Sequence, residues 1–228
     1  MDGQVIQVFD EITHARSAAD PGGERVDRRW VRSRRPLVTV GGELTLDMLD
    51  LAYKPTLKYF EAPLQLKANN GVFIVDDFGR QRLDPQELLN RWIIPLENHQ
   101  DFLRLRTGQK FAIPFDQFIV FATNLEPRTL VDEAFLRRLR SKVKVDYVSR
   151  DQFVEIFRLY CNQYHLKFDP EPVEYLLCRY YDGGQRPLTA CHPRDLLEQI
   201  LDYCRFHQLP PRLTAENLDR ACHSYFVA

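Results

Sequence analysis

The stretch GVFIVDDFGR, residues 71–80, constrains the fold more than any other part of the sequence. Its apolar run from Val72 to Val75 is β-branched or aromatic without polar alternation, which is typical of a strand buried on both faces of a parallel sheet. Such a strand can place charge only at its end, and here Asp76 and Asp77 follow it. Ligands bind at the carboxyl ends of strands in open α/β sheets, so we expect these aspartates to meet a cation or a polarised water. A helix cap or turn is the alternative, and it explains one aspartate more easily than two.

A second apolar run, residues 118–122, also stops at polar residues, Thr123 and Asn124, so we expect two buried strands that end at one polar edge. Between the two runs, residues 102–115 alternate on both sides of Thr107-Gly108-Gln109, which predicts a hairpin. Further elements are expected on either side of the first run. They are a short amphipathic helix at 43–53 and a longer helix at 84–98, capped by Asp84 and bent or ended by Pro95.

From Ser149 onward the pattern becomes helical. Ser149 and Gln152 form a predicted capping box, and apolar residues follow at helical spacing in four segments. We interpret the aromatic stripes of these helices as core. The sequence therefore predicts an α/β region over 1–148 and a small helical domain over 149–228.

Charge and composition exclude few classes of protein. The 31 basic and 32 acidic residues give a formal net charge of -1, so no overall field favours nucleic acid. Six arginines between positions 25 and 35 are interleaved with acidic residues, which argues for a solvated loop or a subunit contact and against nucleic acid. No segment resembles a signal peptide or membrane span, so we expect a cytoplasmic protein. The five cysteines form no C-x-x-C pair, which favours reduced helix residues over zinc ligands.

The order of these features carries more information than any one of them. It begins with four apolar residues followed by two aspartates, and continues with a hairpin and a strand that ends in Thr-Asn. The segment DEAFLRRLRSK comes next, and a helical region containing HPRDLLEQI follows. This succession resembles the AAA+ ATPases over roughly residues 36–228. The stretch LKANNGVFIVDDFGRQ and the hairpin after it look most like the branch that includes bacterial enhancer-binding activators. The resemblance implies a truncated AAA+ α/β nucleotide domain followed by an all-helical lid.

The resemblance also implies roles for the residues at the two strand ends. Asp76 would be the Walker B ligand that holds Mg²⁺, mostly through water, and Asp77 would orient or deprotonate the attacking water. Most of the family has Glu at the second place, and Asp is one methylene shorter. Asn124 would be sensor 1, since an amide can fix the water and contact the γ-phosphate. The alternative for Asn124 is a structural role, in which its side-chain amide makes its hydrogen bonds locally at the end of the strand.

Three arginines have implied roles as well. Arg137 and Arg138 would supply the arginine finger that stabilises charge at a neighbouring subunit's nucleotide, and the residues do not decide between them. A solvated cluster with Arg140 and Lys142 is the alternative. Arg194 follows Pro193 at a predicted helix start and would be sensor 2 rather than a generic surface arginine.

The family's phosphate-binding loop, G-x-x-x-x-G-K-[ST], does not occur in this sequence, because none of the ten glycines is followed by lysine. The resemblance places that loop and its strand before residue 1, so we expect residues 1–228 alone to have little ATPase activity. Two functions stay open. One is the catalytic part of a hexameric ATP- and Mg²⁺-dependent machine that remodels a protein partner, and the other is a non-catalytic AAA-like assembly or regulatory module.

Overall fold

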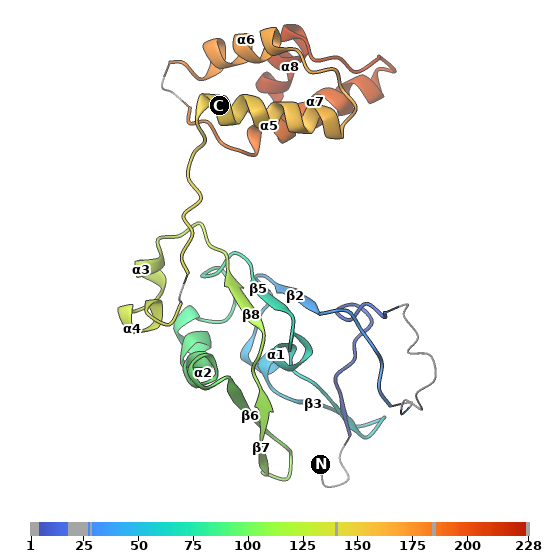
Figure 1. The fold of residues 1–228 in the computed structure, drawn as a ribbon, viewed down its shortest axis with the longest axis vertical. Helices are drawn as coiled ribbons and strands as arrows, with labels where there is room; N and C mark the ends of the chain where they lie inside the picture. The colour runs from blue at the N-terminus through green and yellow to red at the C-terminus, as the bar shows by residue number, and fades with distance from the viewer. Residues whose placement is uncertain (1–4, 18–26, 28, 140, 184–185, 227–228) are drawn as a thin grey trace. The chain divides into compact units, whose positions relative to one another are not determined.

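The computed structural model describes residues 5–17, 27, 29–139, 141–183 and 186–226 (Figure 1). Contacts divide the chain into two compact units, Met1–Lys142 and Val143–Ala228, which we call unit 1 and unit 2. All described strands lie in unit 1, and unit 2 is helical in its described part. The predicted order, a parallel sheet followed by helices, is therefore confirmed. In the described ranges no helix is both long and apolar enough to cross a membrane.

A three-stranded parallel sheet forms the centre of unit 1. Its strands, in spatial order, are β2 (Leu37–Val40), β5 (Val72–Val75) and β8 (Phe118–Phe121). In the register of the sheet, Val75 lies between Val40 and Phe121, so the three carboxyl ends meet at one edge. At the opposite edge β2 and β5 approach closely at Gly71, where an added Cβ would lie 2.0 Å from the carbonyl oxygen of Pro36. Only glycine fits this approach.

One face of the sheet is buried and the other is partly open. Helix α2 (Pro85–Asn98) packs on the buried face, where Trp92 is inaccessible and meets Phe73 edge-on at 5.2 Å between ring centroids. On the other face Leu37 and Phe118 are 56% and 69% exposed. The prediction that both strands are buried on both faces is therefore wrong for the described chain. The physical reason is that α2 packs against one face only, so alternate side chains of β5 and β8 remain accessible.

Helix α2 begins as predicted and ends later than Pro95. The Asp84 carboxylate accepts a hydrogen bond from the amide of Gln86 at 2.7 Å, and Pro85 occupies the first turn. The helix continues past Pro95 to Asn98 and stops at His99, whose φ of 54° lies in the left-handed region. Pro95 is therefore accommodated inside the last turn.

The predicted hairpin is present. It consists of the antiparallel strands β6 (Gln100–Arg104) and β7 (Lys110–Pro114). Leu103, Leu105 and Ile113 are buried, while Arg104 and Lys110 are exposed. Leu103, Leu105 and Ile113 thus lie on the buried side of the hairpin, and the other side, with Arg104, Lys110 and the 54% exposed Phe102, is accessible.

A second, small sheet was not predicted as a whole. Its strands are β1 (Ile6–Gln7), β4 (Tyr59–Glu61) and β3 (Ala52–Lys54), with β4 in the middle. The expected helix at 43–53 is reduced to a 3-10 turn, η1 (Leu46–Leu49), because the chain enters β3 directly afterwards. Short helices complete unit 1: α1 (Leu64–Lys67), α3 (Pro127–Leu130) and α4 (Glu133–Leu136).

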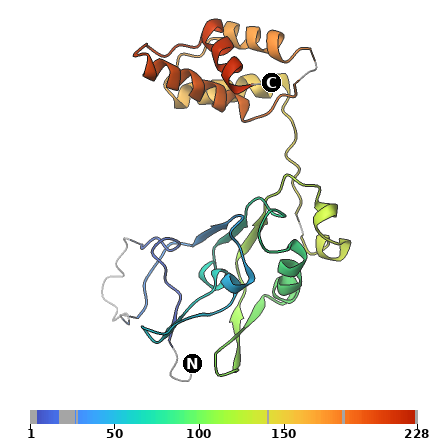
Figure 2. The same ribbon diagram turned by 180° about the vertical axis from the view of Figure 1, so that it is seen from behind.

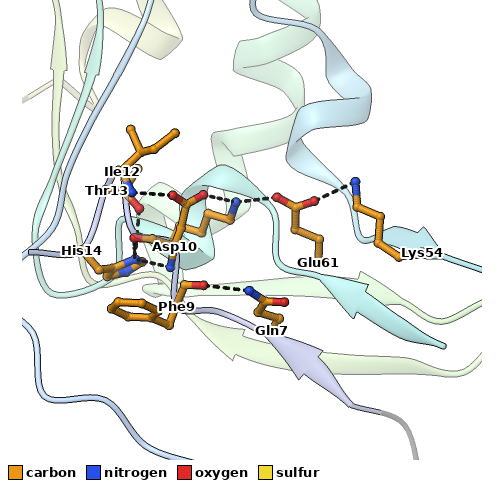
Figure 3. Close-up of polar contacts among 9 residues, drawn as sticks. Gln7, Phe9, Asp10, Ile12, Thr13, His14, Lys54 and Glu61 are labelled. Atoms are coloured by element: carbon orange, nitrogen blue, oxygen red, sulfur yellow. Dashed lines mark hydrogen bonds and ion pairs between the residues drawn. The ribbon is translucent and has the colours of Figure 1, made fainter. Parts of the chain in front are cut away.

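A buried lysine, Lys67 of α1, ties the N-terminal segment to this small sheet through Asp10 and Glu61, which are both labelled in Figure 3. The Lys67 side chain is 6% exposed, and its ammonium lies 2.8 Å from Asp10 and 2.7 Å from Glu61. The carboxylate of Glu61 also forms an ion pair with the ammonium of Lys54, at 2.9 Å between oxygen and nitrogen. The hydrogen bond from Lys67 lowers the pKa of Asp10 and of Glu61. Burial alone would lower the pKa of Lys67, but its two carboxylate partners raise it above the ordinary value.

The described part of unit 2 is built from four helices around one core. They are α5 (Arg150–Gln163), α6 (Pro170–Tyr180), α7 (His192–Phe206) and α8 (Ala215–Tyr225). The predicted capping box is confirmed, since Ser149 and Gln152 each bond the other's backbone amide. All four helices contribute fully buried side chains: Phe153, Phe157, Leu176, Leu177, Leu196, Leu197 and Leu218. The aromatic stripes are therefore core, as the spacing predicted.

Candidate functional site at the carboxyl edge of the parallel sheet

The chain turns sharply where β5 ends. The amide of Asp76 still donates to the carbonyl of Val40 at 2.8 Å, which extends the β2–β5 ladder by one residue. Asp77 then adopts a φ of +50°, a conformation that Asp tolerates better than most residues. The amide of Asp77 donates to the carboxylate of Asp76 at 3.0 Å. This turn presents both carboxylates at the end of the strand.

The ends of β5 and β8 are joined by hydrogen bonds. The amide of Phe78 donates to the carbonyl of Ala122 at 2.7 Å, and the Thr123 hydroxyl donates to the carbonyl of Phe78 at 2.7 Å. Thr123 also accepts from the amide of Leu125 at 3.1 Å, which shapes the turn after β8. The structure therefore brings the Asp76–Asp77 turn and the Thr123–Asn124 turn side by side.

The polar groups at this edge are available to a ligand. Asp76, Asp77 and Asn124 are exposed. Within the described residues no lysine or arginine lies within 4.0 Å of either carboxylate, and no hydrogen bond engages the Asn124 side chain. Two carboxylates without an ion-pair partner in the described chain and one amide therefore follow neighbouring strands at one sheet edge, and a hard cation prefers oxygen ligands of this kind.

The two candidate finger arginines differ in their surroundings. Arg137, directly after α4, has a side chain that is 81% exposed and lies 3.7 Å from Glu133. Arg138 is 27% exposed, and its Nε donates to Glu97 of α2 at 2.7 Å. Arg137 is therefore the more accessible of the two, while Arg138 has a contact that holds α4 to α2.

Arg194 lies in the first turn of α7, as predicted. Its guanidinium contacts the carboxylate of Asp195 at 2.8 and 2.9 Å and lies 4.0 Å from Glu198. The hydrogen bond with Asp195 raises the pKa of Arg194. Asp195 also accepts from the Tyr225 hydroxyl at 2.7 Å, which links the start of α7 to the end of α8. Arg194 is thus held by acidic neighbours of its own helix.

Comparison with solved structures decides the fold. The chain superposes on NtrX from Brucella abortus in complex with ADP with a TM-score of 0.53 and 17% sequence identity, over 80% of this chain and 42% of that chain. It also superposes on the RuvB Holliday junction branch migration motor of Thermotoga maritima with a TM-score of 0.52 and 12% identity, over 82% and 52%. Both are AAA+ ATPases. The fold is AAA+-like. This chain spans less than half of NtrX and about half of RuvB.

Comparison of sequences adds one family and no relative of known function. Residues 149–224 match a family described as a domain of unknown function, DUF8689. No curated protein matches the chain. The match falls within unit 2, so the AAA+-like fold is known here from structural similarity.

Two further residues at the AAA+-like sheet edge were missed by the sequence analysis. Gln81 donates to the carbonyl of Asp76 at 2.7 Å and accepts from the amide of Gly79 at 2.8 Å, so it braces the turn. Glu43 follows β2 and accepts from the amide of Gly41 at 3.1 Å, a bond that lowers its pKa. A signal for Glu43 was present, because Gly-Gly-Glu follows the apolar strand PLVTV. Nothing local marked Gln81.

The residues at this edge fit only part of a nucleotide site. In the described chain no group of three or more His, Cys, Asp or Glu side chains could hold a metal directly. Asp76 with its neighbour Asp77 instead fits Mg²⁺ held largely through water, as the cation prefers. The phosphates of ATP require backbone amides of a glycine-rich loop and its lysine, and the sequence contains no such loop.

Proposed function

We propose that residues 1–228 form the larger part of an AAA+ ATPase domain whose nucleotide site is completed by a segment outside this sequence. The observation that carries the proposal is the pair of unpaired carboxylates, Asp76 and Asp77, beside Asn124 at the carboxyl edge of an AAA+-like sheet. Asp76 would hold Mg²⁺ through water, Asp77 would orient the attacking water as its general base, and Asn124 would position that water. Bound Mg-ATP would supply the phosphoryl group.

The open parts of unit 1 support the idea of a completing segment. In the described chain β8 pairs with β5 alone, so its second edge is free to accept another parallel strand. Leu37 and Phe118 on the uncovered sheet face are largely exposed, which is costly for a finished domain. In unit 2, the extended segment 143–148 alternates like a strand, and Val143, Val145 and Tyr147 are exposed. A further segment, made of a strand, a glycine-rich loop and a helix, would pair with the free edge of β8 and cover exposed apolar side chains.

The arginines would act in different ways. Arg137, exposed and only loosely paired with Glu133, would reach the nucleotide of a neighbouring subunit as the finger in a homo-oligomer such as a hexamer. Arg138 would set the position of α4 through Glu97. Arg194 would act as sensor 2 after leaving Asp195, since a phosphate offers it a stronger charged partner.

Calorimetric ATP titration tests this proposal. The chain extended upstream to include a glycine-rich loop should bind ATP with an affinity about three orders of magnitude or more higher than that of residues 1–228. The reason is that phosphate contacts supply several kcal/mol of binding free energy. In the extended chain Asp77→Asn should keep ATP binding and lower phosphate release by about 100-fold or more, while Asp47→Asn serves as an exposed control. Micromolar ATP binding by residues 1–228, or an unchanged Asp77→Asn rate, would show that the nucleotide lies elsewhere.

A non-catalytic assembly or regulatory module is the second candidate. The ion pairs of Arg138 with Glu97 and of Arg194 with Asp195 favour it, because both arginines already have structural partners. In that case the extended chain would bind nucleotide without turnover, and Arg137→Ala would leave oligomer formation unchanged. Phosphate release that depends on Arg137 but not on Arg128, an exposed arginine of α3, would favour the ATPase.

A further inference from the structure

Arg194 lies in the part of unit 2 where three helices meet. Helix α7 packs against both α5 and α8, as the two opposite views of Figures 1 and 2 show. The Asp195 carboxylate contacts Arg194 through one oxygen, Oδ1, which accepts a hydrogen bond from Nε at 2.9 Å and lies 2.8 Å from Nη2. Residues adjacent in a helix do not normally face each other. The contact between these neighbours therefore indicates that the Asp195 side chain is held in one direction.

Tyr225 of α8 holds Asp195 in that direction. The Tyr225 hydroxyl donates to the second oxygen of Asp195, Oδ2, at 2.7 Å, which leaves Oδ1 for the guanidinium of Arg194. Burial raises the pKa of Asp195, but the hydrogen bonds from Tyr225 and Arg194 together outweigh it and lower that pKa below its ordinary value. Asp195 is therefore a charged acceptor whose orientation depends on α8.

A second tyrosine holds a second carboxylate near the same guanidinium. The hydroxyl of Tyr164, directly after α5, donates to Oε1 of Glu198 at 2.7 Å, and this oxygen lies 4.0 Å from Nε of Arg194. The Tyr164 ring stacks on Tyr160, with 6.0 Å between centroids. The bond to Glu198 raises the pKa of Tyr164 to about 12, so the hydroxyl remains a donor at neutral pH. The two tyrosine hydroxyls and the two carboxylates around Arg194 are called the acidic clasp: Tyr225, Tyr164, Asp195 and Glu198.

We propose that the acidic clasp keeps Arg194 from binding anions until a polyphosphate displaces it. One guanidinium beside two carboxylates leaves the local charge negative, which repels a weakly charged anion. A triphosphate chain competes better, because its several charged oxygens bind a guanidinium in two-point geometry. The inference rests on the proposed role of Arg194 as sensor 2. It adds that α5 and α8, through their tyrosines, set how readily the arginine is released to a nucleotide.

Side-chain NMR of residues 1–228 tests the clasp without nucleotide. Asp195→Asn keeps an oxygen for the Tyr225 hydroxyl but removes the charge that holds Arg194. The Nε–H of Arg194, assigned by its loss in Arg194→Lys, should exchange with water about 10-fold faster or more in Asp195→Asn, and by a smaller factor in Tyr225→Phe. Asp151→Asn is the matched control, since Asp151 is an exposed acid in the first turn of α5 and has no ion pair in the described chain. It should leave the exchange rate unchanged.

Titration with inorganic tripolyphosphate tests the exclusion of anions. In low salt, Asp195→Asn should bind tripolyphosphate about fivefold more tightly or more than the wild type, because a competing and repelling charge is gone. The gain should disappear when Arg194→Gln is added to Asp195→Asn. Asp151→Asn should bind like the wild type.

Three results would overturn the clasp. They are an Arg194 exchange rate that neither Asp195→Asn nor Tyr225→Phe changes, no detectable tripolyphosphate binding by Asp195→Asn, and a gain in binding that Asp151→Asn reproduces or that Arg194→Gln does not abolish. Failure of the proposed ATPase would be distinct from all three. In that case the extended chain would not bind or hydrolyse ATP, while residues 1–228 would still show the expected exchange rates and tripolyphosphate affinities.

Discussion

The two units bury their apolar residues in different ways. In unit 2 the four helices face one another, and large side chains from each are fully buried in one core. In unit 1 the sheet buries Phe73, Val75 and Trp92 on one face but leaves Leu37 and Phe118 exposed on the other. Unit 2 is thus a closed structure, whereas unit 1 has an open sheet face and an open strand edge in its described part.

This difference indicates where stability and function are located. A closed helical core gains its burial from local contacts, while an open sheet depends on a few close approaches. The two tryptophans, Trp30 and Trp92, both lie in unit 1, and only Trp92 is buried. Tryptophan fluorescence therefore reports on unit 1, and far-ultraviolet circular dichroism reports largely on the helices of unit 2. The unfolding of each unit can therefore be followed by its own signal.

The largest effect is expected at Gly71. A methyl group there would lie 2.0 Å from the carbonyl oxygen of Pro36, a backbone atom that cannot move aside without breaking the β2–β5 ladder. Gly71→Ala should therefore destabilise unit 1 by about 3–5 kcal/mol. The fluorescence transition should shift to lower denaturant concentration, while the helical signal of unit 2 should keep its midpoint.

Gly42→Ala is the matched control, since the nearest atom to its added Cβ is 3.8 Å away. It should change the free energy of unfolding of unit 1, measured by fluorescence, by less than about 0.5 kcal/mol. If Gly71→Ala moved both transitions together, the two units would unfold as one cooperative structure.

A smaller effect is expected from Lys67→Met. At neutral pH this change leaves the carboxylates of Asp10 and Glu61 without their buried cation, so unit 1 should lose about 2–3 kcal/mol. The exposed Lys58→Met serves as the control in the same unit. Urea titrations followed by fluorescence measure both variants, and an equal loss in both would mean that Lys67 contributes no more than a surface lysine.

The effect of Lys67→Met should depend on pH. The pKa values of Asp10 and Glu61 are lowered in the folded state, so their contribution is present above the unfolded values of about 4 and is lost as pH falls through the folded values. The pKa of Lys67 is raised, so its contribution is complete below about 10.4 and is lost as pH rises through its higher folded value. The stability difference between wild type and variant should be widest between about pH 5 and 10.

Sequence reasoning predicted the elements that have strong local signals. The apolar runs at 72–75 and 118–121 are strands, and the polar residues after them meet at one edge because parallel strands with one register must end together. The hairpin was identified from alternation around Gly108, and α5 from its capping box. Each of these depends on neighbours in the sequence.

Features that depend on distant partners were missed or wrong. Two-sided burial of β5 was wrong because an unbroken apolar run does not reveal how many helices pack against it. Lys67 was not noticed because its burial depends on Asp10, which lies 57 residues away. Gln81 was missed because a single glutamine in a turn has no distinctive pattern until the turn folds around it.

The smallest effect is expected at the start of unit 2. Ser149 accepts from the amide of Gln152, and Gln152 accepts from the amide of Ser149 at 2.9 Å, so Ser149→Ala removes one half of the box and weakens the other. The loss should be about 1 kcal/mol, seen as an earlier helical transition in circular dichroism with an unchanged fluorescence transition. Ser149→Asp should recover the stability, because an aspartate caps the same amide and favours the helix N-terminus. A shift in fluorescence equal to that in dichroism would show that the first turn of α5 also stabilises the sheet, and the closed and open units would then be one cooperative structure.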